Sequence, residues 1–253
     1  MADAAAAHTI AHFRTASLTI DNKRADAGQD GFDPVTVADR SAEEAMRAVL
    51  AELRPRDGIY GEEFGTLDGT SGLTWVLDPI DGTRAYMIGA PTWGTLISVV
   101  DATGPRLGLI DQPHTGERWA GGLGRADLAR GRDHTKLQTS GTDTLAAATL
   151  CTTFPEIGTP QDRAAFSKVA EQVRLVRYGL DCYAYGLVAA GSVDLVIEAG
   201  LEPYDVCGPI GVIEAAGGLV TDWQGGPAHG GGRVLAAANP AIHAAALAEL
   251  NRG

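Results

Sequence analysis

Residues 75–83, Trp-Val-Leu-Asp-Pro-Ile-Asp-Gly-Thr, bring two carboxylates to the carboxyl end of a short apolar strand. Asp78 and Asp81 are followed at once by Gly82 and Thr83, whose backbone N–H groups could face an anion. Carboxylate oxygens bind hard divalent cations, and free N–H groups at the start of a helix bind phosphate oxygens. The segment therefore predicts a loop that holds a metal ion and a phosphate ester together.

Three other acidic clusters have ordinary structural explanations when each is taken alone. Asp39 and Asp205 each lie near the start of a predicted helix, where Asp is a common capping residue. Glu62 and Glu63 lie between glycines, which is typical of a solvated turn. Even the segment 75–83 could be a simple Asp-Pro turn. The joint occurrence of all four along one chain is what favours a shared site.

The elements that would position the first of these acids are two helices and a run of strands. Residues 4–18 are predicted to form the first helix, and a second follows residues 33–36, with Ser41 and Glu44 as its capping box. The predicted apolar face of the second helix consists of Met46, Val49, Leu50 and Leu53. Strand-like runs at 74–78, 94–100, 106–110 and 117–120 predict an antiparallel meander.

The second part of the chain has an alternating α/β pattern. The stretch 121–144 is polar and rich in glycine, so we expect a boundary near residue 140 between two halves, 1–140 and 141–253. Strands are predicted at 146–152, 174–178 and 193–198, and helices at 181–191 and 206–216. Thr159-Pro160 and Asn239-Pro240 are predicted to open two further helices.

Composition limits the partners of this chain. It has 253 residues with a net charge of −12, and nucleic acids and anionic membranes both select basic surfaces. No apolar run approaches the roughly 18 residues that a membrane span needs, and no signal peptide is evident. The three cysteines are far apart and fit no metal-binding spacing, which favours reduced thiols in a cytoplasmic protein.

The order of the acidic motifs carries a family resemblance. Glu-Glu, a strand, Asp-x-x-Asp-Gly-Thr and, much later, an aromatic-Asp pair before Ile-Glu-Ala-Ala-Gly-Gly resemble the inositol monophosphatase family from about residue 10 to residue 245. This resemblance implies a layered αβαβα sandwich of the α/β (α+β) class, with the active site between its halves. It also implies a Mg²⁺-dependent, lithium-sensitive phosphomonoesterase that acts on a small phosphorylated substrate as a homodimer.

The resemblance also assigns roles to individual residues. It places two or three Mg²⁺ ions on Glu62, Asp78, the carbonyl of Ile80, Asp81 and Asp205. Asp39, which ends the element Asp33-Pro34-Val35-Thr36-Val37-Ala38-Asp39, would face a metal-bound water or a third ion. The phosphate would contact Asp81, Gly82 and Thr83. The residues expected to take part in catalysis are Glu62, Asp39 and Thr83.

Two short sequence motifs resemble the histidinol-phosphatase branch of the family. Asp-Gly-Thr-Arg-Ala-Tyr at 81–86 and Asp-Cys-Tyr-Ala-Tyr at 181–185 carry this second resemblance. It implies hydrolysis of L-histidinol phosphate, with the substrate contacted by Arg84, Asp181, Glu198 and Asp205. A carboxylate at 181 could bind an amine or an imidazole by charge-assisted hydrogen bonds.

Several alternatives stay open at this stage. Asp181 could serve only as the N-cap of the helix that follows it. The same chemistry could act on inositol 1-phosphate or on a 3′-phosphonucleotide, and a non-catalytic module that binds a phospholigand is a third possibility. Two local features depart from the family pattern: a Gly- and Asp-rich insertion at 23–32, and Gly208-Pro209 in the predicted first turn of the Asp205 helix.

Overall fold

The computed structural model describes residues 1–16, 18, 20–22 and 34–252. The insertion at 23–32 and Asp33 lie outside the described residues. Within the described part of the chain, no helix is both long and apolar enough to cross a bilayer.

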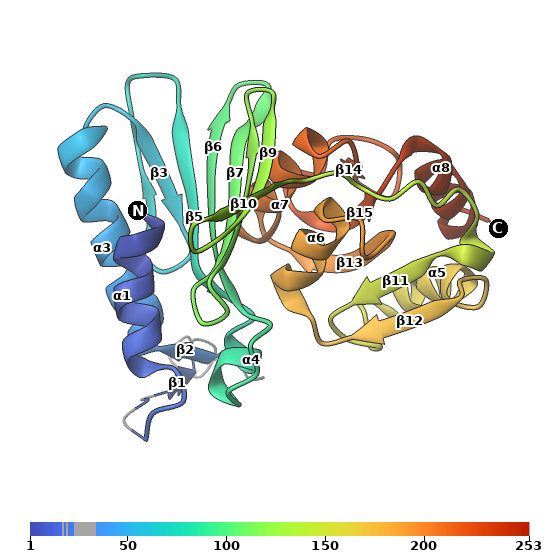
Figure 1. The fold of residues 1–253 in the computed structure, drawn as a ribbon, viewed down its shortest axis with the longest axis horizontal. Helices are drawn as coiled ribbons and strands as arrows, with labels where there is room; N and C mark the ends of the chain where they lie inside the picture. Colours follow the sequence, from blue (N-terminus) through green and yellow to red (C-terminus); the bar gives the residue numbers. More distant parts are fainter. Residues whose placement is uncertain (17, 19, 23–33, 253) are drawn as a thin grey trace.

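The first half of the chain is built on an eight-stranded sheet. Its strand order is β10-β9-β8-β7-β6-β5-β3-β4, and of its pairs β3 with β5 is parallel whereas the others are antiparallel. The strands are β3 (Gly58–Gly61), β4 (Gly65–Leu67), β5 (Thr74–Asp81), β6 (Gly94–Asp101), β7 (Gly104–Gln112), β8 (Glu117–Gly122), β9 (Arg125–Arg130) and β10 (Asp133–Lys136). Helices α1 (Ala2–His12) and α3 (Val37–Leu53) lie on one face of this sheet, as Figure 1 shows. A small ribbon of β1 (Ile20–Asn22) and β2 (Pro34–Thr36) leads into α3.

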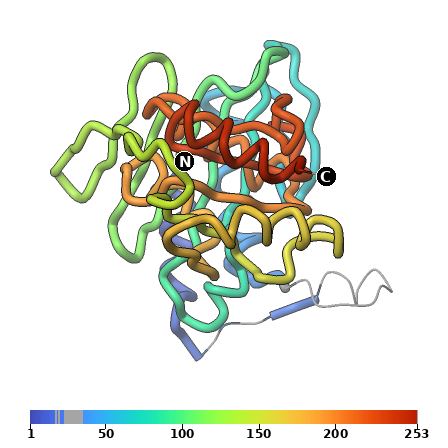
Figure 2. The backbone as a smooth tube through the Cα atoms, turned by 90° about the vertical axis from the view of Figure 1, so that its right-hand side faces the viewer, coloured from blue at the N-terminus to red at the C-terminus, as the bar shows by residue number. Residues whose placement is uncertain are grey.

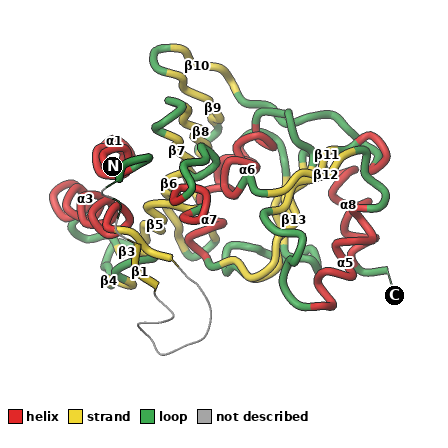
Figure 3. Tube along the Cα trace, turned by 90° about the horizontal axis from the view of Figure 1, so that it is seen from below, coloured by secondary structure: helices red, strands yellow, loops and turns green. Residues whose placement is uncertain are grey.

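The second half is built on a five-stranded sheet of order β12-β11-β13-β15-β14. Its strands are β11 (Thr149–Thr152), β12 (Leu175–Tyr178), β13 (Leu195–Leu201), β14 (Leu219–Thr221) and β15 (Gly232–Ala237), and a 3₁₀ turn at Leu145–Ala147 precedes them. Helices α5 (Pro160–Ala170) and α8 (Pro240–Leu250) lie side by side on its outer face (Figure 2). Helices α6 (Asp181–Ala189) and α7 (Pro203–Ala215) lie between the two sheets (Figure 3).

Reading across Figure 1, the layers are α1/α3, the first sheet, α6/α7, the second sheet and α5/α8. Separate apolar clusters fill the spaces between them: one around Met46 and Leu77, one around Ile110 and Ile213, and one around Leu195 and Ile242. The predicted αβαβα sandwich is therefore confirmed.

The start of α3 differs from the sequence prediction. The N-cap is Thr36, and Asp39 three residues later completes the capping box by accepting hydrogen bonds from the Thr36 N–H and hydroxyl. The box predicted at Ser41 and Glu44 is therefore wrong, because the helix already begins at Val37. Leu53 was predicted on the buried face but is 67% exposed, since it lies in the last, solvent-facing turn.

The polar stretch 121–144 contains two strands that the sequence reasoning missed. Strands β9 and β10 pair as a hairpin and extend the first sheet to its edge. All residues of β10 are exposed, so this strand has no apolar alternation that could have signalled it. The other predicted strands and helices beyond residue 145 are present, with ends shifted by a few residues.

Helix α7 begins at Pro203, three residues before its predicted start. Gly208 and Pro209 therefore lie inside the helix and not in its first turn as expected. Helix α7 lies against strand β7 at backbone distance: a Cβ on Gly108 of β7 would reach 2.0 Å from the carbonyl oxygen of Gly208, and a Cβ on Gly208 would lie 3.1 Å from the carbonyl oxygen of Leu109. Glycine at this crossing lets the helix approach the sheet closely, and this contact sets where Asp205 lies relative to β5.

Candidate metal and phosphate site

A bulge in strand β5 brings the first two acids together. In a regular strand, residues three apart point to opposite faces, so Asp78 and Asp81 would diverge. The ladder with β6 pairs Asp78 with Leu96 and Asp81 with Gly94, so the register shifts between the two acids. This extra residue turns both side chains to the same side.

Asp205 joins them from the other half of the chain. Single carboxylate oxygens of Asp78, Asp81 and Asp205 all lie within 4.8 Å of one another. Asp205 is the third residue of α7, and its Oδ2 accepts a hydrogen bond of 2.7 Å from the N–H of Glu202. Asp205 thus has the capping-type bond of the ordinary explanation and also lies in the acidic cluster.

The electrostatics of this cluster suit a cation. Burial, followed by the charges of Glu62 and Asp81, raises the pKa of Asp78 well above its usual value. Burial and then the charge of Asp181 do the same to the pKa of Asp81, and burial is the main cause that raises the pKa of Asp205 to about 7. Carboxylates crowded in this way repel one another when ionised, and a divalent cation would relieve that repulsion. The oxygen-only donor set fits a hard ion such as Mg²⁺.

Glu62 is held beside this cluster by its neighbours. Its N–H donates to the Leu77 carbonyl at 3.1 Å, and its carboxylate is the largest neighbouring charge acting on Asp78. The next residue, Glu63, donates its N–H to the fully buried carboxylate of Glu43 at 2.7 Å. Arg47 pairs with Glu43 at 2.8 Å. The Glu62-Glu63 segment is therefore anchored from α3 and is more than a solvated turn.

Asp39 and Thr83 have local partners in the structure. Asp39 is buried, and its Oδ2 accepts from Thr36 as part of the capping box. The hydroxyl of Thr83 donates to the Ile80 carbonyl at 3.1 Å, which leaves that oxygen a second lone pair. Gly82, with φ of +80°, is the N-cap of the short helix α4 (Thr83–Met87). The roles expected for these residues remain predictions.

Asp181 lies against Gly82 in a strained backbone conformation. Its φ is +45°, and it is the first residue of α6, whose N-cap is Leu180 without a side-chain capping bond. The alternative that Asp181 is an N-cap is therefore wrong. A Cβ on Gly82 would lie only 2.9 Å from the Cβ of Asp181, so Gly82 admits this approach. The following N–H, of Cys182, donates to Oδ2 of Asp81 at 2.9 Å.

The remaining substrate-contact candidates form a second acidic group. Oε1 of Glu198 accepts hydrogen bonds from the N–H and hydroxyl of Thr153, at 2.7 and 2.9 Å. Burial raises the pKa of Glu198 to about 7 and that of Asp181 to about 6, and Arg84 opposes the second shift. The Arg84 guanidinium lies 5.1 Å from the ring centroid of Phe154.

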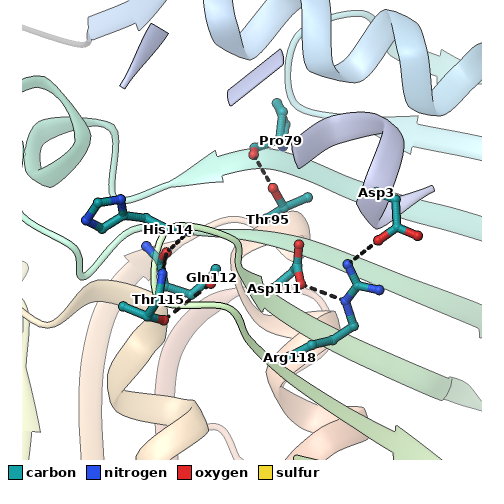
Figure 4. Close-up of polar contacts among 8 residues, drawn as sticks. All are labelled: Asp3, Pro79, Thr95, Asp111, Gln112, His114, Thr115 and Arg118. Atoms are coloured by element: carbon teal, nitrogen blue, oxygen red, sulfur yellow. Dashed lines mark hydrogen bonds and ion pairs between the residues drawn. The ribbon is translucent and has the colours of Figure 1, made fainter. Parts of the chain in front are cut away.

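Buried polar side chains of β6, β7 and β8 form contacts beside and beneath the bulge of β5 that the sequence did not reveal. Thr95 donates its hydroxyl to the Pro79 carbonyl at 2.8 Å, as Figure 4 shows. Gln112 donates to the Trp93 carbonyl at 2.8 Å and accepts from the N–H of His114. Arg118 joins Asp111 to Asp3 of α1 (Figure 4). Buried polar side chains within strand-like runs were the available signal, but sequence alone does not tell which carbonyl they meet.

Comparison with known proteins identifies the family of this chain. The family model of the inositol monophosphatase family matches residues 1–252, and the chain belongs to this family, whose members are metal-dependent phosphatases. The histidinol-phosphatase of Streptomyces coelicolor is 34% identical over 100% of this chain and 94% of its own length.

Two further relatives are informative. The chloroplastic bifunctional phosphatase IMPL2 of Arabidopsis thaliana is 46% identical over 78% of this chain, and the match spans 57% of that protein. A solved structure of an inositol monophosphatase from Zymomonas mobilis aligns with a TM-score of 0.86 and 38% identity, covering 99% of this chain and 94% of that one. The Streptomyces coelicolor relative supports the predicted branch, whereas the Zymomonas mobilis protein is named for a different phosphate ester.

Proposed function

We propose that this chain is a Mg²⁺-dependent phosphomonoesterase that hydrolyses L-histidinol phosphate to L-histidinol and phosphate. The observation that carries the proposal is the second acidic group: Asp181 lies against Gly82, which follows the metal-site acid Asp81, and the charge of Asp181 contributes to the raised pKa of Glu198. Histidinol phosphate presents an ammonium and an imidazole, which carboxylates can bind by charge-assisted hydrogen bonds. Inositol presents only hydroxyl groups and has no need of this charge.

In the proposed reaction, Glu62, Asp78, Asp81, Asp205 and the Ile80 carbonyl would hold two or three Mg²⁺ ions. Bound Mg²⁺ supplies charge neutralisation for the phosphate and lowers the pKa of a water that attacks phosphorus. The backbone N–H groups of Gly82 and Thr83 orient the phosphate, and Thr83 and Glu62 position the water. Asp39 would face a further water or ion from the α3 side.

On the leaving-group side, Asp181 and Glu198 bind the amine and imidazole. Arg84 and Asp205 line the rest of the proposed substrate-binding surface. A charged partner on the part of the substrate that does not react fixes the phosphate in line for attack, which lowers the entropic part of the barrier. Asp181 is well placed for this role because Cys182, the residue that follows it, already binds Asp81.

The second candidate is hydrolysis of inositol 1-phosphate. It is favoured by the likeness to the Zymomonas mobilis structure and by the inositol-1-monophosphatase of Mycobacterium bovis, which is 35% identical over 87% of this chain. A 3′-phosphonucleotide and a non-catalytic phospholigand role remain as wider alternatives.

Phosphate release from histidinol phosphate, inositol 1-phosphate and a 3′-phosphonucleotide, each with and without Mg²⁺, separates these candidates. We expect Mg²⁺-stimulated release with the highest kcat/KM on histidinol phosphate. A preference for inositol phosphate would replace the substrate and keep the chemistry. Release from none of them would favour the non-catalytic role.

We also propose that the protein is cytoplasmic and a homodimer. The three cysteines are free and buried, which suits a reducing compartment. Size-exclusion chromatography with light scattering tests the dimer directly, and lithium titration of the phosphatase activity tests the sensitivity that the family resemblance implies.

A further inference from the structure

Thr95 lies directly opposite the bulge of β5. Its neighbours in β6, Gly94 and Leu96, pair with Asp81 and Asp78, so Pro79 and Ile80 both face Thr95 outside the regular ladder. Thr95 is fully buried, and so is the bulged segment at Pro79. The strand geometry that brings the two acids together therefore also leaves a buried carbonyl in need of a donor.

The side chain of Thr95 supplies that donor. Its hydroxyl donates to the Pro79 carbonyl at 2.8 Å, and Figure 4 shows the two groups pointing at each other across the strands. A buried carbonyl that loses its partner costs about 1–3 kcal/mol. The hydrogen bond from Thr95 therefore offsets the cost of burying the Pro79 carbonyl in the bulge.

The same peptide unit is held at its other end by a candidate metal ligand. The Pro79 carbonyl and the Ile80 N–H belong to one planar group, and this N–H donates to Oδ1 of Asp78 at 2.9 Å. Rotation of the plane would therefore move both bonds together. Thr95 fixes the carbonyl, the plane transmits this constraint, and the N–H orients the Asp78 carboxylate.

We propose that Thr95 is a positioning residue of the candidate metal site: its hydroxyl sets the Pro79–Ile80 peptide plane, which aims the Asp78 carboxylate at a divalent cation shared with Asp81 and Asp205. This inference rests on the proposed metal site, not on the identity of the substrate. The next carbonyl, that of Ile80, is oriented by the same turn and accepts from Thr83.

The test compares variants that remove or keep the donor. Thr95→Val removes the hydroxyl with little change of shape, Thr95→Ala does so in a smaller side chain, and Thr95→Ser keeps it. Ser98→Ala is the matched control, because Ser98 lies in the same strand and donates to the Leu107 carbonyl at 2.7 Å. Mg²⁺ binding without substrate is measured by calorimetry, Mn²⁺ binding by electron paramagnetic resonance, and thermal unfolding in EDTA.

We expect Thr95→Val and Thr95→Ala to weaken Mg²⁺ binding by about 10- to 100-fold, the usual loss when a group that orients a metal ligand is removed. Thr95→Ser should restore the parent affinity. Ser98→Ala should lower thermal stability and leave Mg²⁺ binding unchanged. Either donor-less variant suffices if the other does not fold.

Parent-like Mg²⁺ affinity in a folded donor-less variant would overturn the inference, as would a parent protein that binds neither Mg²⁺ nor Mn²⁺. Equal loss of affinity in Ser98→Ala would also overturn it, since the effect would then follow stability alone. A parent that binds Mg²⁺ but prefers another phosphate ester refutes only the proposed substrate, and the Thr95 result is read in the same way.

Discussion

The carboxylates on the two walls of the site differ in their electrostatic surroundings and hydrogen-bond partners. On the wall formed by β5 and the start of α7, carboxylate oxygens of Asp78, Asp81 and Asp205 lie within 4.8 Å of one another, and burial together with neighbouring carboxylates raises the pKa of each acid. On the wall formed by α6 and β13, Glu198 accepts two hydrogen bonds from Thr153, and the charge of Arg84 favours the ionised form of Asp181. In the proposed function, the first set therefore needs an added cation to balance its charge, whereas the second accepts hydrogen bonds from the substrate.

The two walls also differ in how neighbouring strands and helices hold them: hydrogen bonds brace the first, whereas the second contains a strained backbone position. The Asp78 loop is braced from β6 by Thr95, and the Glu62 segment is braced from α3 by Glu43. Asp181, in contrast, has a positive φ, which is uncommon for a residue other than glycine. Stable bracing suits ligands that must keep a fixed geometry, and strained backbone is common where a side chain is aimed at a ligand.

Asp78→Asn should have the largest effect and tests the first wall. The substitution keeps the shape but removes a charge that a metal ion needs, so we expect Mg²⁺-dependent phosphate release to fall by about 10³-fold or more, or about 4 kcal/mol. Circular dichroism should show an unchanged fold. Asp133→Asn, on the exposed strand β10, is the control and should keep full activity. Full turnover by Asp78→Asn would contradict the metal assignment.

In the absence of metal, the buried carboxylates of both walls should make stability depend on pH, and Glu198 gives the clearest contribution. The pKa of Glu198 is raised to about 7, so the folded protein binds more protons than the unfolded chain between about pH 4.5 and pH 7. Stability in EDTA should therefore fall as the pH rises through this window and level off above it, with Glu198 contributing up to about 3 kcal/mol.

Thermal unfolding in EDTA from pH 4.5 to 8 measures this slope. Glu198→Gln should reduce it, and the first-wall carboxylates should supply the rest. Addition of Mg²⁺ should raise stability most at the upper end of the range, where the acids are ionised. Stability that rises with pH in EDTA would contradict the raised pKa values of these buried carboxylates.

Asp181→Asn tests the second wall. Loss of the charge should remove one charge-assisted hydrogen bond, worth about 1.5–3 kcal/mol, and reduce kcat/KM on histidinol phosphate by roughly 10- to 100-fold. Hydrolysis of inositol 1-phosphate should change little, because that substrate has no cationic group. Equal losses on both substrates would place Asp181 with the first wall. Mg²⁺ affinity measured by calorimetry serves as the control and should be retained.

Phe154→Leu should have the smallest effect. The ring lies under the Arg84 guanidinium, and such a contact is worth about 0.5–1 kcal/mol at an exposed position. We expect KM for histidinol phosphate to rise by a few-fold at nearly constant kcat, as Arg84 becomes less well oriented. Phe154→Tyr keeps the ring and should behave as the parent. An unchanged KM in Phe154→Leu would remove Phe154 from the second wall.

Much of the fold could be predicted from local chemistry. Helix α5 begins after Thr159 and α8 after Asn239, because a capping side chain followed by proline specifies a helix start locally. Strands β5 and β6 were predicted from apolar runs. Strand β10 was missed because it is exposed throughout, and the true cap of α3 was missed because Ser41 and Glu44 have the same motif spacing as Thr36 and Asp39.

The amino-acid sequence specifies which acids are present and in what order, and this order is enough to recognise the family of the chain. Asp78, Asp81 and Asp205 could be singled out because their residue types and neighbours are local information. Their meeting in space could not be read from the sequence, because it depends on a bulge in β5 and on a glycine contact that docks α7 on the sheet. The tertiary structure likewise decided that Thr95 supports the loop, because a hydroxyl finds its carbonyl partner only when two strands pair.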